Sequence, residues 1–193
     1  MKKDIIFAGV GGQGIISAAA MIVTQADRLG LKCKQNEVHG MAQRGGSVLC
    51  HVRLSSDVIY SDIIQKGGAD IILATEPMEA IRYSEYLSSN GIIIASNRPV
   101  KNIDYPELEP LIAEIKKVSG SIIVDGEAIV SELKNEKMLN VAMVGALAEV
   151  LKIDGLKEGI AADIKKRFEK KGEEIVKLNL KAFESGIKYG ANR

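Results

Sequence analysis

The chain has 193 residues, enough for one domain with a sizeable core and too few for two domains of ordinary size. Its 26 Lys and Arg residues nearly balance its 25 Asp and Glu residues, and a net charge of +1 argues against the broad basic surface of a nucleic-acid-binding protein. No apolar run approaches the roughly 20 residues that span a bilayer. Because the N-terminus also lacks the apolar core of a secretory signal, we expect a cytoplasmic protein that does not bind a membrane.

The first forty residues predict a β-α-β unit. Residues 4–8 are almost all apolar, as in a strand buried on both faces of a parallel sheet. A glycine-rich turn follows at residues 9–14. Residues 15–29 are apolar almost all round, which predicts a helix that lies against the sheet and ends at Gly30. Residues 31–38 predict a second strand.

The pattern then changes to one typical of antiparallel pairing. Residues 47–54 predict a strand, and residues 58–64 predict a returning strand after a polar turn at residues 55–57. This spacing indicates a hairpin beside the parallel core. Residues 69–75 predict another buried strand, and Pro77 is placed to begin the helix that follows it.

The last third of the chain is predicted to be mainly helical. Strands at 92–96 and 121–124 enclose a helix at 107–117, and helix continues from Lys137 onward. Residues 139–151 are small and apolar, which suits either a core helix or a docking surface, with core favoured. Further along, one helix face is predicted to carry Ile175, Leu178, Asn179, Ala182, Phe183 and Gly186.

Two cysteines, Cys33 and Cys50, lie in strand patterns outside any C-x-x-C pair. Two thiols cannot supply the four ligands of an iron–sulfur cluster, so we predict small buried side chains and no metal site. No repeat or linker divides the sequence. We therefore expect a single α/β domain over residues 1–193, with a mostly parallel sheet flanked by helices, an antiparallel hairpin and a helical C-terminus.

The glycine turn allows two interpretations. Gly9, Gly11 and Gly14 match the G-x-G-x-x-G spacing between a strand and a helix, where free backbone N–H groups can bind an anion. Glu37, near the end of the second strand, lies where an acid would bind the ribose of a dinucleotide. Alternatively, the turn only lets the first helix pack closely on the sheet, and Glu37 anchors the loop after it. The motif alone does not decide between them.

The loop at residues 39–46 (HGMAQRGG) is the least ordinary segment, because it has few solvating charges. Arg44 is a strong donor for a carboxylate or phosphate, and His39 can in principle transfer a proton. However, Ser47 lacks a nucleophile elbow, and His51 is predicted to be a hydrogen-bonded histidine within a strand. We therefore predict a docking surface, then an anion contact, and no catalytic residue. The residues predicted for the interface are His39, Gly40, Met41, Gln43, Arg44, Gly45 and Gly46.

These two segments also carry a family resemblance. GVGGQG at 9–14, followed by EVHGMAQRGGSV at 37–48, resembles the gamma-type domain of 2-oxoacid:ferredoxin oxidoreductases. Within that family the second segment is most similar to the beta subunit of indolepyruvate ferredoxin oxidoreductases, since pyruvate-type relatives usually carry different residues before Arg-Gly-Gly. The likeness covers nearly the whole chain and continues through Glu76–Pro77, residues 79–82, Asn140, Met143, Gly145 and residues 179–184.

The resemblance implies a Rossmann-like subunit, inactive alone, of an enzyme that decarboxylates indolepyruvate or another aryl 2-oxoacid, forms an acyl-CoA and reduces ferredoxin. It places thiamine diphosphate, Mg and 4Fe–4S clusters in a large alpha subunit and no cofactor in this chain. It implies that coenzyme A would be contacted by backbone N–H groups of the turn and by one arginine. The candidate residues are Gly11, Gly12, Gln13, Gly14 and Arg44.

Three alternatives remain open at this stage. The chain would be the gamma subunit of a pyruvate- or 2-oxoglutarate-type enzyme, a stand-alone NAD- or nucleotide-binding enzyme, or a regulatory interaction protein. The preferred 2-oxoacid and the stoichiometry of the complex are not set by this sequence. Exposed apolar surface would favour a homodimer when the chain is purified alone.

Overall fold

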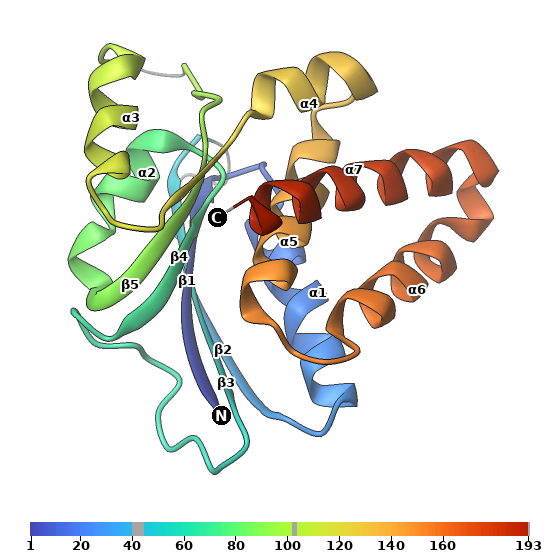
Figure 1. Ribbon diagram of the computed structural model, residues 1–193, viewed down its shortest axis with the longest axis horizontal. Helices are drawn as coiled ribbons and strands as arrows, with labels where there is room; N and C mark the ends of the chain where they lie inside the picture. Colours follow the sequence, from blue (N-terminus) through green and yellow to red (C-terminus); the bar gives the residue numbers. More distant parts are fainter. Residues whose placement is uncertain (40–44, 102–103, 193) are drawn as a thin grey trace.

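In a computed structural model, which describes residues 1–39, 45–101 and 104–192, a six-stranded sheet has helices on both faces (Figure 1). Along the sheet the strand order is β2-β3-β1-β4-β5-β6. The strands are β1 (Lys2–Val10), β2 (Lys32–His39), β3 (Ser47–Ser55), β4 (Ala69–Ala74), β5 (Leu87–Ser96) and β6 (Ile122–Val124).

Most of the sheet is parallel, and its antiparallel part is formed by β3. Strands β1, β4, β5 and β6 pair in parallel, whereas β3 pairs antiparallel with β1 on one side and with β2 on the other. The predicted α/β class is therefore confirmed. Strands β1 and β2 run in the same direction, as the predicted β-α-β unit requires, but β3 lies between them.

Helices cover the two faces unequally (Figure 1). Helices α2 and α3 pack on one face, and α1, α5, α6 and α7 pack on the other, with α4 beside them. The bounds are α1 (Ile15–Arg28), α2 (Pro77–Arg82), α3 (Leu108–Lys116), α4 (Gly126–Leu133), α5 (Lys137–Leu151), α6 (Leu156–Phe168) and α7 (Glu173–Ala191), with 3-10 turns at Ser84–Tyr86 and Glu169–Lys171.

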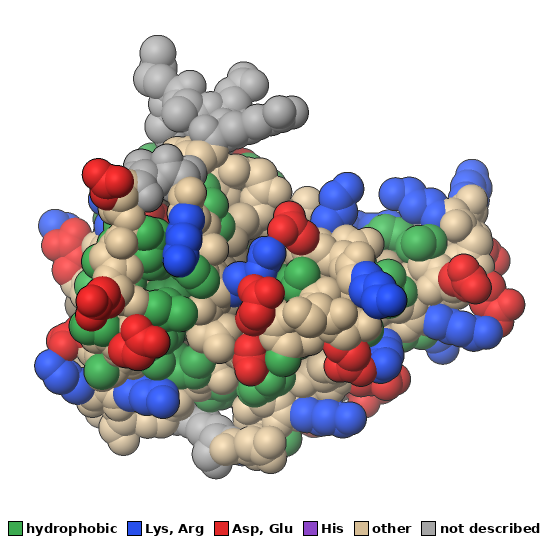
Figure 2. Space-filling model, turned by 90° about the horizontal axis from the view of Figure 1, so that it is seen from above, with side chains coloured by type: hydrophobic (Ala, Val, Ile, Leu, Met, Phe, Trp, Pro, Cys, Tyr) green, Lys and Arg blue, Asp and Glu red, His purple; other side chains and the backbone are tan. Residues whose placement is uncertain are grey.

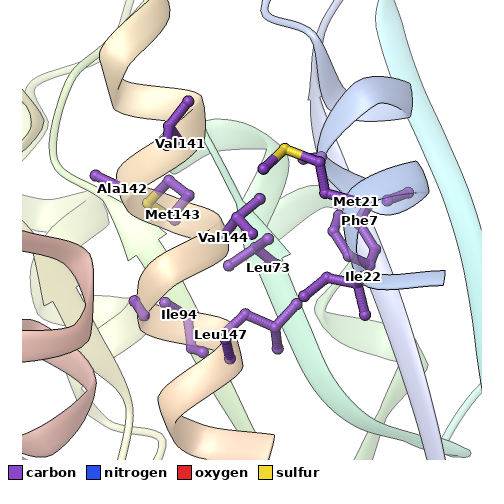
Figure 3. Packing of buried hydrophobic residues seen from close by; sticks show 14 of the residues in the cluster. Phe7, Met21, Ile22, Leu73, Ile94, Val141, Ala142, Met143, Val144 and Leu147 are labelled. Carbon is purple, nitrogen blue, oxygen red and sulfur yellow. The ribbon is translucent and has the colours of Figure 1, made fainter. Parts of the chain in front are cut away.

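Helix α5 is a core helix, as the prediction for residues 139–151 favoured. Its residues are buried almost all round, and Figure 3 shows Val144 and Leu147 directed toward the sheet beside Leu73 of β4. Its outer side packs on α7, where glycines bring the two backbones close together. A Cβ on Gly186 would lie only 1.8 Å from the carbonyl oxygen of Ala142. The small residues of α5 thus serve packing inside the chain rather than docking.

The predicted hairpin with residues 58–64 is wrong. These residues form no strand, and the antiparallel partners of β3 are β1 and β2. Residues 57–64, here called the strap, are held by side chains of β3 instead. Arg53 Nη1 donates to the carbonyl oxygens of Ser61 and Ile63, at 3.0 and 3.2 Å, and His51 Nδ1 accepts the Ile64 N–H at 3.2 Å. The apolar residues of the segment suggested a strand, but side chains of β3 provide hydrogen-bond partners for the strap backbone in place of a paired strand.

The buried His51 is expected to make stability depend on pH. Burial lowers its pKa, with Arg53 adding to the effect and Asp62 opposing it. Because the native state holds His51 neutral, stability should fall as the pH drops below the unfolded histidine value of about 6.5, by at most about 1.4 kcal/mol per pH unit. Urea denaturation between pH 7.5 and 5 would measure this slope. In His51→Asn, whose amide oxygen can accept the same N–H, the slope should be flatter; an identical slope would contradict this role.

The cysteines behave as predicted for small, apolar side chains. Cys50 is buried, Cys33 is partly buried, and both are free thiols. Burial raises the pKa of Cys33 to about 11 and that of Cys50 to about 12, so neither thiol is activated at neutral pH. Across the described residues, no helix has both the length and the apolar character to cross a bilayer.

Candidate functional site

The candidate site lies where the connections after two adjacent strands diverge. After β1 the chain passes to α1 on one face of the sheet, and after β4, which pairs in parallel with β1, it passes to α2 on the other face. Such a divergence opens a crevice beyond the carboxyl ends of the strands, the usual ligand position in open α/β sheets. Here the crevice is bordered by the glycine turn at residues 9–14 and by Thr75 and Glu76.

Each glycine of the turn has a different local requirement. At Gly9 a Cβ would lie 2.4 Å from both Ile15 Cδ1 and Thr75 Oγ1, so this glycine lets α1 and β4 approach the end of β1. Gly12 (φ +101°) and Gly14 (φ +76°) adopt left-handed conformations that favour glycine. Close packing, one of the two interpretations of the motif, therefore accounts for Gly9, while Gly12 borders the open crevice.

The side chain of Gln13 is hydrogen-bonded both to the turn and to Thr75. Its Oε1 accepts the Val10 N–H and the Thr75 hydroxyl, each at 2.8 Å, and its Nε2 donates to the Thr75 carbonyl at 3.3 Å. Its own backbone N–H donates to the Val10 carbonyl at 3.0 Å. The side chain thus ties the end of β1 to the end of β4 across the point of divergence.

Replacing Gln13 with alanine should destabilise the protein by about 1–3 kcal/mol, because the Val10 N–H loses its acceptor next to a buried strand. Urea denaturation would measure the change. A matched control is Gln35→Ala, which removes a bond to the exposed Glu37 and should change stability by less than about 0.5 kcal/mol. Equal effects of the two substitutions would contradict the structural role of Gln13.

The crevice has two hollows on either side of the turn. The first, about 320 Å³, is lined by Gly12, Gln13, Arg98 and Asn140 among others. Arg98 donates to Glu136 at 2.8 Å and to Glu127 at 3.0 Å, and the bond to Glu136 contributes most to raising its pKa.

Asn140 of α5 connects this first hollow to the glycine turn. Its Nδ2 donates to the Gly14 carbonyl at 2.9 Å. Its Oδ1 is buried and accepts no hydrogen bond from the part of the chain that the structure describes. The amide therefore fixes the start of α1 relative to α5.

The second hollow, about 210 Å³, contains two buried carboxyl groups. Glu76 is 1% exposed and accepts the Tyr105 hydroxyl and, at 2.9 Å, the Glu79 N–H. Burial and the neighbouring Glu76 raise the pKa of Tyr105. Glu79 is 5% exposed and accepts the Ser47 hydroxyl and, at 3.0 Å, Arg82 Nε. Figure 2 views the molecule from this side and shows acidic and basic side chains interspersed over the face.

The structure locates only part of the predicted site. Of the turn residues, Gly12 and Gln13 line the crevice, and Gly14 follows them as the N-cap of α1. Gly45 and Gly46 lie against the turn, since Gly11 donates to the Gly46 carbonyl at 2.7 Å and accepts from Gly45 at 3.3 Å. Of the loop before them, Gly40, Met41, Gln43 and Arg44 lie outside the described residues, and only the backbone of His39, at the end of β2, is described.

Glu37 does not occupy the position of a ribose-binding acid. Strand β3 separates β2 from the glycine turn, and Glu37 is exposed and accepts from Gln35 Nε2 at 2.7 Å. The sequence predicted no site role for several residues of the crevice, although the family resemblance covers three of them, Glu76, Glu79 and Asn140. The available signal was their position directly after the ends of buried strands or on the core helix: Thr75, Glu76, Glu79, Arg98 and Asn140.

Comparisons with known proteins agree with this architecture. Residues 4–189 match the family model described as pyruvate ferredoxin/flavodoxin oxidoreductase. The chain is 36% identical to the indolepyruvate oxidoreductase subunit IorB of Archaeoglobus fulgidus, covering 96% of this chain and 94% of that protein. It is 26% identical to the common gamma subunit of the pyruvate/ketoisovalerate oxidoreductases of Thermococcus kodakarensis, over 96% of this chain and 98% of that protein.

A solved structure shows the same fold within a longer chain. The 2-oxoglutarate:ferredoxin oxidoreductase from Magnetococcus marinus, with 2-oxoglutarate, coenzyme A and succinyl-CoA bound, superposes with a TM-score of 0.81 at 24% identity. The match covers all of this chain and 31% of that one, so this chain spans about a third of its length.

Proposed function

This chain belongs to the pyruvate ferredoxin/flavodoxin oxidoreductase family, and we propose that it is the small subunit of an indolepyruvate oxidoreductase. The observation that carries the proposal is its markedly higher identity to the indolepyruvate-type subunit than to the pyruvate-type gamma subunit, over nearly the full length of each. Its large partner would decarboxylate indolepyruvate or a related aryl 2-oxoacid, transfer the acyl group to coenzyme A and reduce ferredoxin.

In this arrangement the chain docks on the large alpha subunit and contributes no catalytic residue. Thiamine diphosphate, Mg and 4Fe–4S clusters would be held by the partner, and ferredoxin would be reached through the complex. The thiols of this chain do not fit a cluster, because there are two of them and burial keeps both protonated. The interface is proposed around residues 39–46, whose last two residues, Gly45 and Gly46, are hydrogen-bonded to Gly11 of the glycine turn.

Coenzyme A is the proposed ligand of the glycine turn. Of the backbone N–H groups predicted to bind its phosphates, those of Gly11 and Gln13 already donate within the protein. For Gly12 and Gly14 the described part of the chain provides no acceptor, and Gly14 is the N-cap of α1, where the helix dipole favours an anion. Gly12 and Gly14, with charge from Arg44, are therefore the contacts we propose.

The alternative of a stand-alone dinucleotide-binding enzyme is less well supported. In a dinucleotide site the acidic residue that binds ribose follows the strand next to the glycine turn. Here the glycine turn follows β1, whose neighbour on one side is the antiparallel β3, and Glu37 lies on β2, one strand further away. A gamma subunit of a pyruvate- or 2-oxoglutarate-type enzyme remains the second candidate, because members of those classes have the same fold.

Arg44→Ala tests the coenzyme A contact. In the complex reconstituted with the large subunit, this substitution should raise the KM for coenzyme A roughly tenfold and leave the KM for indolepyruvate unchanged, because a charged hydrogen bond to phosphate is lost. Arg28→Ala is the matched control, since Arg28 pairs with Asp163 at the other end of α1. An unchanged KM for coenzyme A in Arg44→Ala would remove Arg44 from the site.

A further inference from the structure

The short segment that closes the loop, Gly45–Ser47, is bonded to two different parts of the crevice. This segment, here called the arm, extends the antiparallel pairing of β3 with β1 by two backbone bonds to Gly11. At its end, the Ser47 hydroxyl donates to the Glu79 carboxylate and lies 2.8 Å from the Tyr83 hydroxyl. The arm is thus fixed between the glycine turn and α2.

Both oxygens of the Glu79 carboxylate already accept hydrogen bonds within the protein. One carboxylate oxygen accepts from Arg82 and the other from Ser47, and its backbone N–H is capped by Glu76. A buried carboxylate with both oxygens bonded is a rigid support rather than an open ligand site. What it supports is Ser47, which comes from a strand distant in sequence.

The bond between the arm and the turn determines which donors of the turn are used. Because the Gly46 carbonyl accepts the Gly11 N–H, this group is withdrawn from the crevice. The second bond, from the Gly45 N–H to the Gly11 carbonyl at 3.3 Å, holds the peptide before Gly12, whose left-handed conformation depends on the orientation of that peptide. A shift of the arm would therefore change the direction of the remaining N–H groups.

We propose that Glu79 and Ser47 are positioning residues: their hydrogen bond holds the arm against the glycine turn and so orients the N–H groups of Gly12 and Gly14 for a phosphate. The inference rests on the proposed coenzyme A contact and adds to it the residues that set its geometry. Neither side chain is required to touch the ligand.

The test uses three substitutions in β3. Ser47→Ala removes the hydroxyl, Ser47→Thr restores it with a residue suited to a strand, and Ser55→Ala makes the same change at the other end of β3, where the hydroxyl accepts the Asp57 N–H. Two quantities are measured: amide hydrogen exchange of Gly11 in the full chain alone, and the KM for coenzyme A in the reconstituted complex.

The expected result is that Ser47→Ala speeds exchange of the Gly11 amide roughly tenfold and raises the KM for coenzyme A by a similar factor, with kcat little changed. Ser47→Thr should restore both values, and Ser55→Ala should alter neither. Unchanged Gly11 exchange in Ser47→Ala would overturn the positioning role, as would faster exchange with an unchanged KM. If the large subunit proves fully active without this chain, the proposed function fails, and that outcome is distinct because it is seen with the wild-type protein.

Discussion

Gly186→Ala is expected to destabilise the protein by about 3 kcal/mol, although alanine is the better helix former. The new Cβ would lie 1.8 Å from the Ala142 carbonyl oxygen and 2.6 Å from its carbon, so α7 must move away from α5. Overpacking of this kind costs about 1–3 kcal/mol, and more where backbone rather than a flexible side chain is in the way. The gain in helix propensity is about 1 kcal/mol and does not offset it. Urea denaturation monitored by circular dichroism would measure the difference.

Glu184→Ala is the control for this prediction. Glu184 is exposed on the same helix, so its replacement should change stability by less than about 0.5 kcal/mol. Gly145 lies opposite on α5, where a Cβ would be 2.2 Å from the Phe183 carbonyl oxygen. A stability of Gly186→Ala equal to that of the wild type would show that the two helices do not pack this closely.

The second large effect is expected at Arg53, which neutralises a buried carboxylate. Arg53 Nε and Nη2 donate to the two oxygens of Asp4, at 2.8 and 2.9 Å, and the Asp4 side chain is only 4% exposed. Lys2, at 3.0 Å, is largely exposed and is a weaker partner. Removing one member of a buried pair typically costs about 3–5 kcal/mol, so Arg53→Ala should lose about 3 kcal/mol. It also removes the two hydrogen bonds that Arg53 donates to the strap.

A double substitution separates the two contributions. Asp4→Asn in the Arg53→Ala background removes the uncompensated charge and should restore at least about 1 kcal/mol. Urea denaturation of the wild type, the two single variants and the double variant gives the coupling energy. If the double variant is less stable than Arg53→Ala, the buried charge is not what makes Arg53 important.

The sequence was sufficient to predict most elements because their patterns are local. Buried strands such as β4 read as continuous apolar runs, and the predicted face of α7 is buried at Asn179, Ala182, Phe183 and Gly186. Helix α4 was missed, since it is short and begins at a glycine, although Asp125 caps it by accepting the Ala128 N–H. The pairing of β3 depends on contacts between distant segments, so a hairpin with the nearest apolar segment was expected instead.

Only the local part of the candidate site, the glycine turn, could be predicted from the sequence. The turn has a strong local signature, and its position between β1 and α1 followed from spacing alone. The inward direction of Gln13 depends on Thr75, 62 residues away, and the support of the arm depends on a serine and a glutamate 32 residues apart. Such bonds leave no periodic trace in a single sequence.

The most direct test of the account is co-expression of this chain with its candidate large subunit, followed by an anaerobic assay of indolepyruvate- and coenzyme A-dependent reduction of ferredoxin or a viologen dye. The proposed function predicts a stable complex and activity that requires both chains, with neither active alone. Full activity of the large subunit without this chain, and no complex between them, would contradict it.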